Sequence, residues 1–291
     1  MSSLILPAPA KLNLFLHITG RRTDGYHTLQ TVFQLLDYGD TLTFSANSSG
    51  QINFTCSDPA LAGPNNLVVQ AASLLLQKTG FTRGADIYLE KILPQGGGVG
   101  GGSSDAATTL LALNSLWQCG LGIDELAQLG LSLGADVPVF VHGRSAWAEN
   151  VGESLQVLDL SERWYIVLTP DCQVSTGEIF SHPQLTRNTY PIKLAAFAFS
   201  GSKNDCELLV QSLYPPVKRA LDWLSNFAEA RMSGTGASVF ASFDTQAQAK
   251  EVIEHLAQQT ETSGTKIGSA FIARGVNLSP LHQALLDLDK I

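Results

Sequence analysis

The chain has 291 residues, of which 44% are hydrophobic and 15% are charged, and its formal net charge is −8. That length exceeds the roughly 100–200 residues of one domain, so we expect two, and the low charge content predicts a folded globule rather than a disordered chain. The acidic balance, without a cluster of Lys or Arg, disfavours nucleic acid as a partner, and no stretch reaches the ~20 apolar residues of a membrane span.

The first predicted element is a strand over residues 11–18, in which side chains alternate between two faces. One face is wholly apolar and carries Leu12, Leu14, Leu16 and Ile18. The other face is mixed and carries Lys11, Asn13, Phe15 and His17. We therefore expect one dry side and one side that carries chemistry.

Strands and helices then interleave along the rest of the chain. Further strands are predicted at 40–45, 51–56, 85–93, 164–169, 238–243 and 267–273, and helices at 66–78, 103–117, 124–133, 203–213, 216–227 and 245–258, with Asp124 as an N-cap. We place a soft boundary near residue 160, which gives domains 1–160 and 161–291. Four cysteines stand singly, as expected for reduced, buried thiols of a cytosolic protein: Cys56, Cys119, Cys172 and Cys206.

Residues 94–117, PQGGGVGGGSSDAATTLLALNSLW, join a glycine-rich loop directly to a helical pattern. The loop starts at Pro94 and contains Gly96, Gly97, Gly98, Gly100, Gly101 and Gly102. Glycine permits positive φ and close approach of a ligand, at a cost of roughly 0.5–1 kcal/mol each relative to alanine. Ser103 or Ser104 then opens a helix whose free N–H groups face the loop, which predicts a cradle for phosphate.

Other glycine-rich loops fit this stretch less well. Gly96-x-Gly98-x-x-Gly101 matches the dinucleotide fingerprint, but the acidic residue expected about 20 positions later is missing. A P-loop requires Gly-Lys-Ser/Thr, whereas Gly102 is followed by Ser103. A protein kinase would need H-R-D and D-F-G motifs, which the sequence lacks. A flexible linker is disfavoured because the flanking residues are apolar.

Three segments together resemble the galactokinase, homoserine kinase, mevalonate kinase and phosphomevalonate kinase (GHMP) superfamily. They are PAPAKLNLFLHI at 7–18, PQGGGVGGGSSDAA at 94–107 and RMSGTGASVFASF at 231–243. Segments 21–33 and 133–140 resemble the branch that phosphorylates a cytidylated sugar alcohol in non-mevalonate isoprenoid synthesis. The resemblance implies an α+β, cytoplasmic, ATP-dependent kinase with a ribosomal-protein-S5-like N-terminal domain and a ferredoxin-like C-terminal domain.

Two residues are candidates for the chemistry of phosphoryl transfer, which needs alignment, charge stabilisation and an acceptor for a proton. Asp136 lies in Gly-Ala-Asp-Val-Pro beside apolar residues, and the resemblance supports its assignment as the general base. Lys11 would hold that carboxylate ionised and stabilise developing charge. The alternatives are an ordinary helix-end Asp and a strand-edge Lys at the surface.

The resemblance also implies a pocket for cytosine. His27 and Asn13 would contact the edge of the base, Tyr26 would lie against it, and Phe180, at the end of the segment that begins at Thr176, would cover it. Ser233-Gly234-Thr235-Gly236-Ala237 would place backbone amides near the substrate's phosphates. The alternatives are hairpin packing for Tyr26 and His27, a core position for Phe180, and a tight turn for the 233–237 segment.

On the ATP side, Asn66 and Lys91 match positions that line the nucleotide pocket in the superfamily, although Asn66 is equally suited to cap a helix. Mg²⁺ is expected to accompany ATP, but we assign it no protein ligand. The histidines show no zinc-binding spacing. Two readings compete with a kinase for the cytidylated substrate: another small-alcohol kinase of the superfamily, and a ligand-binding relative without catalysis. The oligomeric state stays open.

Overall fold

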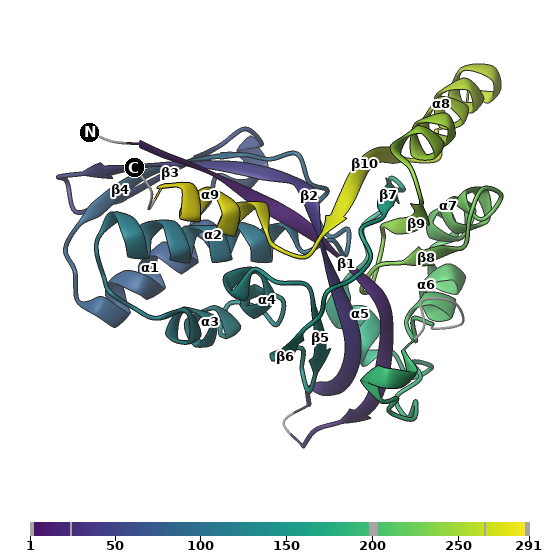
Figure 1. The fold of residues 1–291 in the computed structure, drawn as a ribbon, viewed down its shortest axis with the longest axis horizontal. Helices are drawn as coiled ribbons and strands as arrows, with labels where there is room; N and C mark the ends of the chain where they lie inside the picture. Colours follow the sequence, from purple (N-terminus) through teal and green to yellow (C-terminus); the bar gives the residue numbers. More distant parts are fainter. Residues whose placement is uncertain (1–2, 24, 198–202, 265, 289–291) are drawn as a thin grey trace.

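The computed structural model describes residues 3–23, 25–197, 203–264 and 266–288, and its architecture is α+β as expected (Figure 1). The strands in these residues are β1 (Ser3–Arg21), β2 (His27–Asn47), β3 (Ile52–Cys56), β4 (Gly84–Glu90), β5 (Ala146–Glu149), β6 (Ser154–Val157), β7 (Trp164–Thr169), β8 (Ala230–Met232), β9 (Val239–Phe243) and β10 (Ser269–Val276). The α-helices are α1 (Leu67–Thr79), α2 (Gly101–Leu116), α3 (Ile123–Leu131), α4 (Val137–His142), α5 (Thr176–Ser181), α6 (Glu207–Leu213), α7 (Pro215–Leu224), α8 (Gln246–Ser263) and α9 (Pro280–Leu288). Short 3₁₀ helices span Pro59–Leu61 and Leu194–Ala196.

The long hairpin of β1 and β2 runs through the whole molecule and links its two lobes (Figure 1). In the first lobe, β2 pairs with β4 and β5, and β4 pairs with β3 in parallel. In the second lobe, β10 pairs with β7, and β7 and β8 flank β9. Because β10 also pairs with β2, the strands form one continuous sheet.

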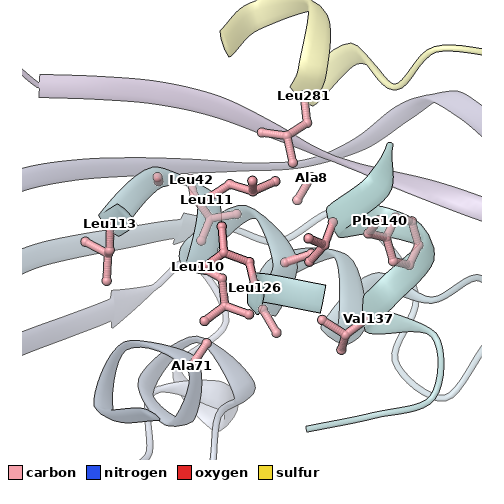
Figure 2. Packing of buried hydrophobic residues seen from close by; sticks show 14 of the residues in the cluster. Ala8, Leu42, Ala71, Leu110, Leu111, Leu113, Leu126, Val137, Phe140 and Leu281 are labelled. Carbon is pink, nitrogen blue, oxygen red and sulfur yellow. The ribbon is translucent and has the colours of Figure 1, made fainter. Parts of the chain in front are cut away.

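Each lobe packs helices on the sheet around its own apolar core. Helices α1, α2, α3, α4 and α9 surround the first core, which Figure 2 shows closing between Leu42 of β2, Leu110 of α2 and Leu281 of α9. The second core lies between β7, β9 and helices α6 to α8, with Val210, Leu221 and Val239 among its buried residues. In the described residues, no helix is both long and apolar enough to cross a bilayer.

The two cores do not follow the chain order in a simple way. Leu281, near the end of the chain, is buried in the first core, whereas Leu16 and Ile18 of β1 are buried in the second. The final helix thus packs with the lobe that is formed by the first half of the chain. The division into residues 1–160 and 161–291 stays a prediction.

The predicted alternation along residues 11–18 is wrong beyond Asn13. The pairing of β1 with β2 shifts register between Asn13 and Leu16, so Phe15 packs in one cluster with Leu12 and Leu14, while Leu16 lies in the second core. Such a bulge rotates the following side chains to the other face. Both faces of this strand are consequently buried.

Other element boundaries also differ from the predictions. Helix α2 begins at Gly101, two residues before Ser103, because Gly100 takes a left-handed conformation with φ of 75° and turns the chain into the helix. Helix α3 begins at Ile123, and Glu125 accepts a hydrogen bond from the Gly122 N–H, so Asp124 lies in the first turn rather than at the cap. All four cysteines are free thiols, but of these Cys206 alone is fully buried.

Candidate active site

Lys11 and Asp136 meet at the centre of the site, as the sequence motifs predict. The distance from Lys11 Nζ to Asp136 Oδ2 is 3.0 Å, and the two side chains are 3% and 32% exposed. Lys11 comes from the middle of β1, and Asp136 precedes α4. The cation is therefore enclosed, while the carboxylate can be reached from solvent.

The local structure at Asp136 rules out its being an ordinary helix cap. It occupies the N-cap position of α4, yet its side chain makes no capping hydrogen bond. Val137 to Val141 of this short helix are all buried, which fixes the backbone at Asp136. The carboxylate is thus held by a rigid neighbour and directed to Lys11.

Lys11 is also held by two oxygen acceptors other than Asp136. Its ammonium donates to Asn13 Oδ1 at 2.5 Å and to the Gly98 carbonyl at 3.1 Å, and it lies 5.4 Å from the centre of the Phe33 ring. The Asn13 amide in turn donates to Thr31 Oγ1 at 3.0 Å. Both ends of the Asn13 side chain are therefore bonded within the protein, although Asn13 still lines the cavity beside Lys11.

Thr31 and Phe33 were missed by the sequence reasoning. Thr31 is fully buried and donates to the Phe15 carbonyl at 2.5 Å. They share a strand with His27 in the segment HTLQTVF, and the even spacing of His27, Thr31 and Phe33 is the signal that they face one side. What the spacing could not give is that Phe33 lies opposite Asn13 and Thr31 opposite Leu16, which depends on the register of β1 and β2.

The glycine-rich loop packs tightly between β1 and the 233–238 turn. The Lys11 N–H donates to the Val99 carbonyl at 2.9 Å, and the Ser233 hydroxyl donates to the Gly98 carbonyl at 2.8 Å. A Cβ on Gly98 would lie 2.2 Å from the Ser233 carbonyl oxygen, and φ at this glycine is 71°. At Gly98, therefore, glycine is required by packing of the protein on itself, a reason that the sequence analysis did not consider.

A second lysine and two carboxylates form a closed cluster on the other side of the loop. Lys91 Nζ lies 2.5 Å from Asp40 Oδ2 and 2.7 Å from Asp105 Oδ2. Burial raises the pKa of Asp105 to about 7, against the lowering effect of Lys91 and together with the charge of Asp40. Burial opposes the charge on Lys91, but the two carboxylates outweigh it and raise its pKa.

Asp40 and Asp105 were also missed, although Lys91 was not. Asp40 Oδ1 accepts the N–H groups of Ile92 and Leu93, so the cluster fixes the chain where it enters the glycine loop. Asp105 follows Ser104 on a buried helical face among alanines, and a charge in such a place signals a partner. That partner, Lys91, could not be identified from spacing alone.

Two cavities meet at the loop. One of about 620 Å³ is lined by Lys11, Asp136 and residues of both lobes, and the other, of about 360 Å³, is lined by most of the loop, Asn66 and Lys91. They share Gly98 and Ser103.

Asn66 caps helix α1, because its side-chain oxygen accepts a hydrogen bond from the Val68 N–H at 2.9 Å. The alternative that Asn66 is a helix cap is therefore correct. Asn66 also lines the smaller cavity.

The loop residues predicted to bind ATP are distributed as follows. The smaller cavity is lined by Pro94, Gly96, Gly97, Gly98, Gly100, Gly101, Gly102 and Ser103. Ser104 is instead fully buried in α2, and its hydroxyl has no hydrogen-bond partner among the described residues.

The far end of the larger cavity brings aromatic rings from both lobes together. The Tyr26 ring is 66% exposed, and the His27 ring stacks on Phe180 with 5.2 Å between centroids. Arg187, which the sequence reasoning missed, donates from Nε to His27 Nε2 at 2.9 Å. Burial, with the charges of Arg187 and Arg21, lowers the pKa of His27. Asp24, in the turn before Tyr26, lies outside the described residues.

The 176 and 233–237 segments also reach this cavity. The hydroxyls of Thr176 and Thr235 lie 2.9 Å apart, and both residues line the wall together with Gly234. Gly236 does not line it, because a Cβ there would face Met232 in the second core. The structure thus brings the predicted substrate residues to one cavity, with the exception of Gly236.

Comparisons with known proteins agree with this arrangement. The family model for the N-terminal domain of GHMP kinases matches residues 66–144, and that for their C-terminal domain matches residues 190–261. A 4-diphosphocytidyl-2-C-methyl-D-erythritol kinase of Pseudomonas syringae pv. syringae is 55% identical over 97% of both chains.

Solved structures give the same assignment. A crystal structure of 4-(cytidine 5'-diphospho)-2C-methyl-D-erythritol kinase is 32% identical and superposes with a TM-score of 0.80, covering 94% of this chain and 100% of that chain. The mevalonate kinase of Methanococcus jannaschii, 16% identical with a TM-score of 0.67 and covering 95% of this chain and 99% of that chain, shares the fold. From its full-length identity to these relatives, the chain belongs to the GHMP kinases and, within them, to the family of 4-diphosphocytidyl-2-C-methyl-D-erythritol kinases.

Proposed function

We propose that the chain transfers the γ-phosphoryl group of ATP to the 2-hydroxyl of 4-diphosphocytidyl-2-C-methyl-D-erythritol, a step of non-mevalonate isoprenoid synthesis. In this reaction the hydroxyl oxygen forms a bond to the γ-phosphorus, and the bond from that phosphorus to the β–γ bridging oxygen breaks. The hydroxyl proton leaves to a base, and ADP departs. Such a transfer depends chiefly on positioning and on charge stabilisation.

One observation carries the proposal: two cavities join beside a lysine–carboxylate pair. The smaller cavity is walled by the glycine loop and the start of α2, where free N–H groups favour phosphate. The larger cavity contains Lys11 and Asp136 and extends to the rings of Tyr26 and Phe180. The two share Gly98 and Ser103, so a phosphate held on the loop would have its γ end next to the acceptor hydroxyl.

The residues at this junction have distinct parts in the proposal. Asp136 accepts the hydroxyl proton, because its carboxylate is accessible and makes no capping hydrogen bond. Lys11 orients that carboxylate through the 3.0 Å contact and offsets negative charge that develops on the phosphoryl group. Asn13 orients Lys11, because Asn13 Oδ1 accepts a hydrogen bond from Lys11 Nζ at 2.5 Å.

Mg²⁺ is part of the proposal only as an ion that arrives with ATP. The described residues contain no group of three or more His, Cys, Asp or Glu side chains that could hold a metal. This part of the chain therefore offers no cage of its own for the ion, and we derive no step from it. When bound to the phosphates it would neutralise part of their charge.

We also propose a cytoplasmic location, which the four free thiols support.

A steady-state assay of ADP release tests the proposal directly. With ATP and the cytidylated substrate the purified chain should release ADP and form the 2-phosphate, detected by ³¹P NMR. Mevalonate, homoserine and the same tetrol without its cytidine diphosphate serve as alternative acceptors. Faster turnover of one of these would favour another small-alcohol kinase, and tight binding of the cytidylated substrate without any ADP would favour a non-catalytic relative.

A further inference from the structure

Arg187 donates four hydrogen bonds although it lines neither of the two cavities. Its Nε donates to His27 Nε2 at 2.9 Å. Its Nη2 donates to the carbonyls of Phe180 at 2.9 Å and His182 at 2.7 Å, and its Nη1 donates to the Leu185 carbonyl at 3.1 Å. One guanidinium therefore binds the 180–187 segment to the start of β2, 160 residues away in the chain.

The chemistry of the guanidinium fixes the state of the imidazole. Arginine has only donors, so a hydrogen bond from its Nε to His27 Nε2 requires Nε2 to carry a lone pair. The proton of the neutral ring is then on Nδ1. A protonated ring would have no acceptor at Nε2 and would place two cations in contact, and burial together with the charges of Arg187 and Arg21 lowers the pKa of His27.

The two segments that Arg187 joins each form part of the wall of the larger cavity. Gly25, Tyr26 and His27 line it from the β1–β2 turn, and Thr176, Gly177 and Phe180 line it from α5. The stack of His27 on Phe180, 5.2 Å between centroids with 27° between the ring planes, is where these walls touch.

We propose that Arg187 is a positioning and specificity-determining residue for the pyrimidine end of the substrate. By fixing the ring tautomer of His27 and the place of Phe180, it prepares a wall of aromatic faces with a ring N–H donor. Aromatic faces stack on a nucleobase, and an N–H donor suits the N3 of cytosine, which is an acceptor, better than the N3–H of uracil. The inference rests on the proposed function, since it assigns the cytidine to this end of the cavity.

Arg187→Met tests it, because methionine keeps the aliphatic length and loses every donor. Loss of charge-assisted hydrogen bonds should weaken CDP binding, measured by calorimetry, by roughly 10- to 100-fold and should raise the KM for the cytidylated substrate similarly. The preference for CDP over UDP should fall. The kcat and the KM for ATP should stay within about threefold, since Arg187 is not at the smaller cavity. Arg187→Lys, which keeps one donor group, should recover part of the loss.

A second measurement does not depend on the variant folding. The ¹⁵N resonances of His27 in the unaltered protein at pH 8 should show a protonated Nδ1 and an unprotonated Nε2. Arg144→Met, which removes an arginine from an exposed ion pair with Asp159, is the matched control and should leave CDP binding unchanged.

The proposal is overturned if Nε2 carries the proton, if the unaltered protein does not bind CDP, or if Arg187→Met binds CDP within twofold of it. These readouts need no turnover. A chain that binds CDP in the expected manner but never phosphorylates the cytidylated substrate would overturn the proposed function and leave the role of Arg187 intact.

Discussion

Two buried lysines flank the glycine loop, and they differ in how far their carboxylate partners can be reached. Asp136, the partner of Lys11, has a side chain that is 32% exposed. Asp40 and Asp105, the partners of Lys91, are 0% and 3% exposed. The same residue types thus form an open pair on one side of the loop and a closed cluster on the other.

This difference separates a catalytic role for the open pair from a structural role for the closed cluster. A carboxylate that transfers a proton must meet its substrate, so the open pair suits catalysis. The closed cluster instead holds backbone, since Asp40 accepts the N–H groups of Ile92 at 2.6 Å and Leu93 at 2.8 Å just before the loop. A buried lysine–carboxylate contact at a cavity wall therefore does not identify a catalytic base, since Lys91 and Asp105 also line the smaller cavity, whereas the exposure of the carboxylate does.

The largest effect is expected from removing the base of the open pair. Asp136→Asn keeps the shape and the contact with Lys11 but cannot accept the hydroxyl proton, so kcat should fall by about 10²- to 10⁴-fold. The KM for ATP should change little, because Asp136 lines the larger cavity only. Coupled ADP release measures both. Asp159→Asn, at an exposed ion pair, is the control. A variant at Asp136 that keeps more than a tenth of kcat would contradict the assignment.

Breaking the closed cluster should affect stability instead of chemistry. Lys91→Met leaves two buried carboxylates without their cation, which typically costs about 3–5 kcal/mol of the free energy of unfolding. Urea denaturation measures the loss, and Lys78→Met, at an exposed lysine in the last turn of α1, controls for it. If Lys91→Met were as stable as the control while its kcat fell like that of Asp136→Asn, the two clusters would not differ as described.

The open pair could be predicted from the sequence, whereas most of the closed cluster could not. Lys11, Asp136 and the glycine loop lie in motifs, and each motif is a short run that can be recognised without knowing its neighbours. The partners Asp40 and Lys91 are 51 residues apart, and Arg187 reaches across 160 residues to His27. Such contacts depend on strand register, and the bulge of β1 between Asn13 and Leu16 shows that periodicity alone does not give it.

Two glycines of the loop provide a finer test of what surrounds the open pair. Gly98 has φ of 71° and its Cβ would lie 2.2 Å from the Ser233 carbonyl oxygen, whereas Gly96 has φ of 62° and open space. Gly96→Ala should therefore cost only the backbone strain, about 1–2 kcal/mol. Gly98→Ala adds a clash with main chain of about 1–3 kcal/mol more and should also raise the KM for ATP. Equal stabilities of the two variants in urea would show that the loop does not pack as described.

The last test concerns the pH dependence of the closed cluster. Burial raises the pKa of Asp105 to about 7, so between its unfolded pKa near 4 and pH 7 the folded protein binds more protons at this group than the unfolded chain does. The free energy of unfolding then falls as pH rises through that window, by about 1.4 kcal/mol for each unit of difference in pKa. Below the window the contribution is fully present, and above it the contribution is lost.

Asp105→Asn removes this titration and keeps a neutral group of the same shape beside Lys91, which retains Asp40 as a partner. Relative to this variant, the unaltered protein should therefore lose stability from about pH 4 to pH 8, as pH rises through the folded pKa of about 7, and change little above pH 8. Urea midpoints at half-unit steps give the difference curve, and Asp222→Asn, at an exposed i,i+4 pair, should give a flat one. A flat difference curve for Asp105→Asn as well would mean that folding does not raise the pKa of Asp105. Its carboxyl would then be in contact with water, and the closed cluster would be as open as the pair at Lys11.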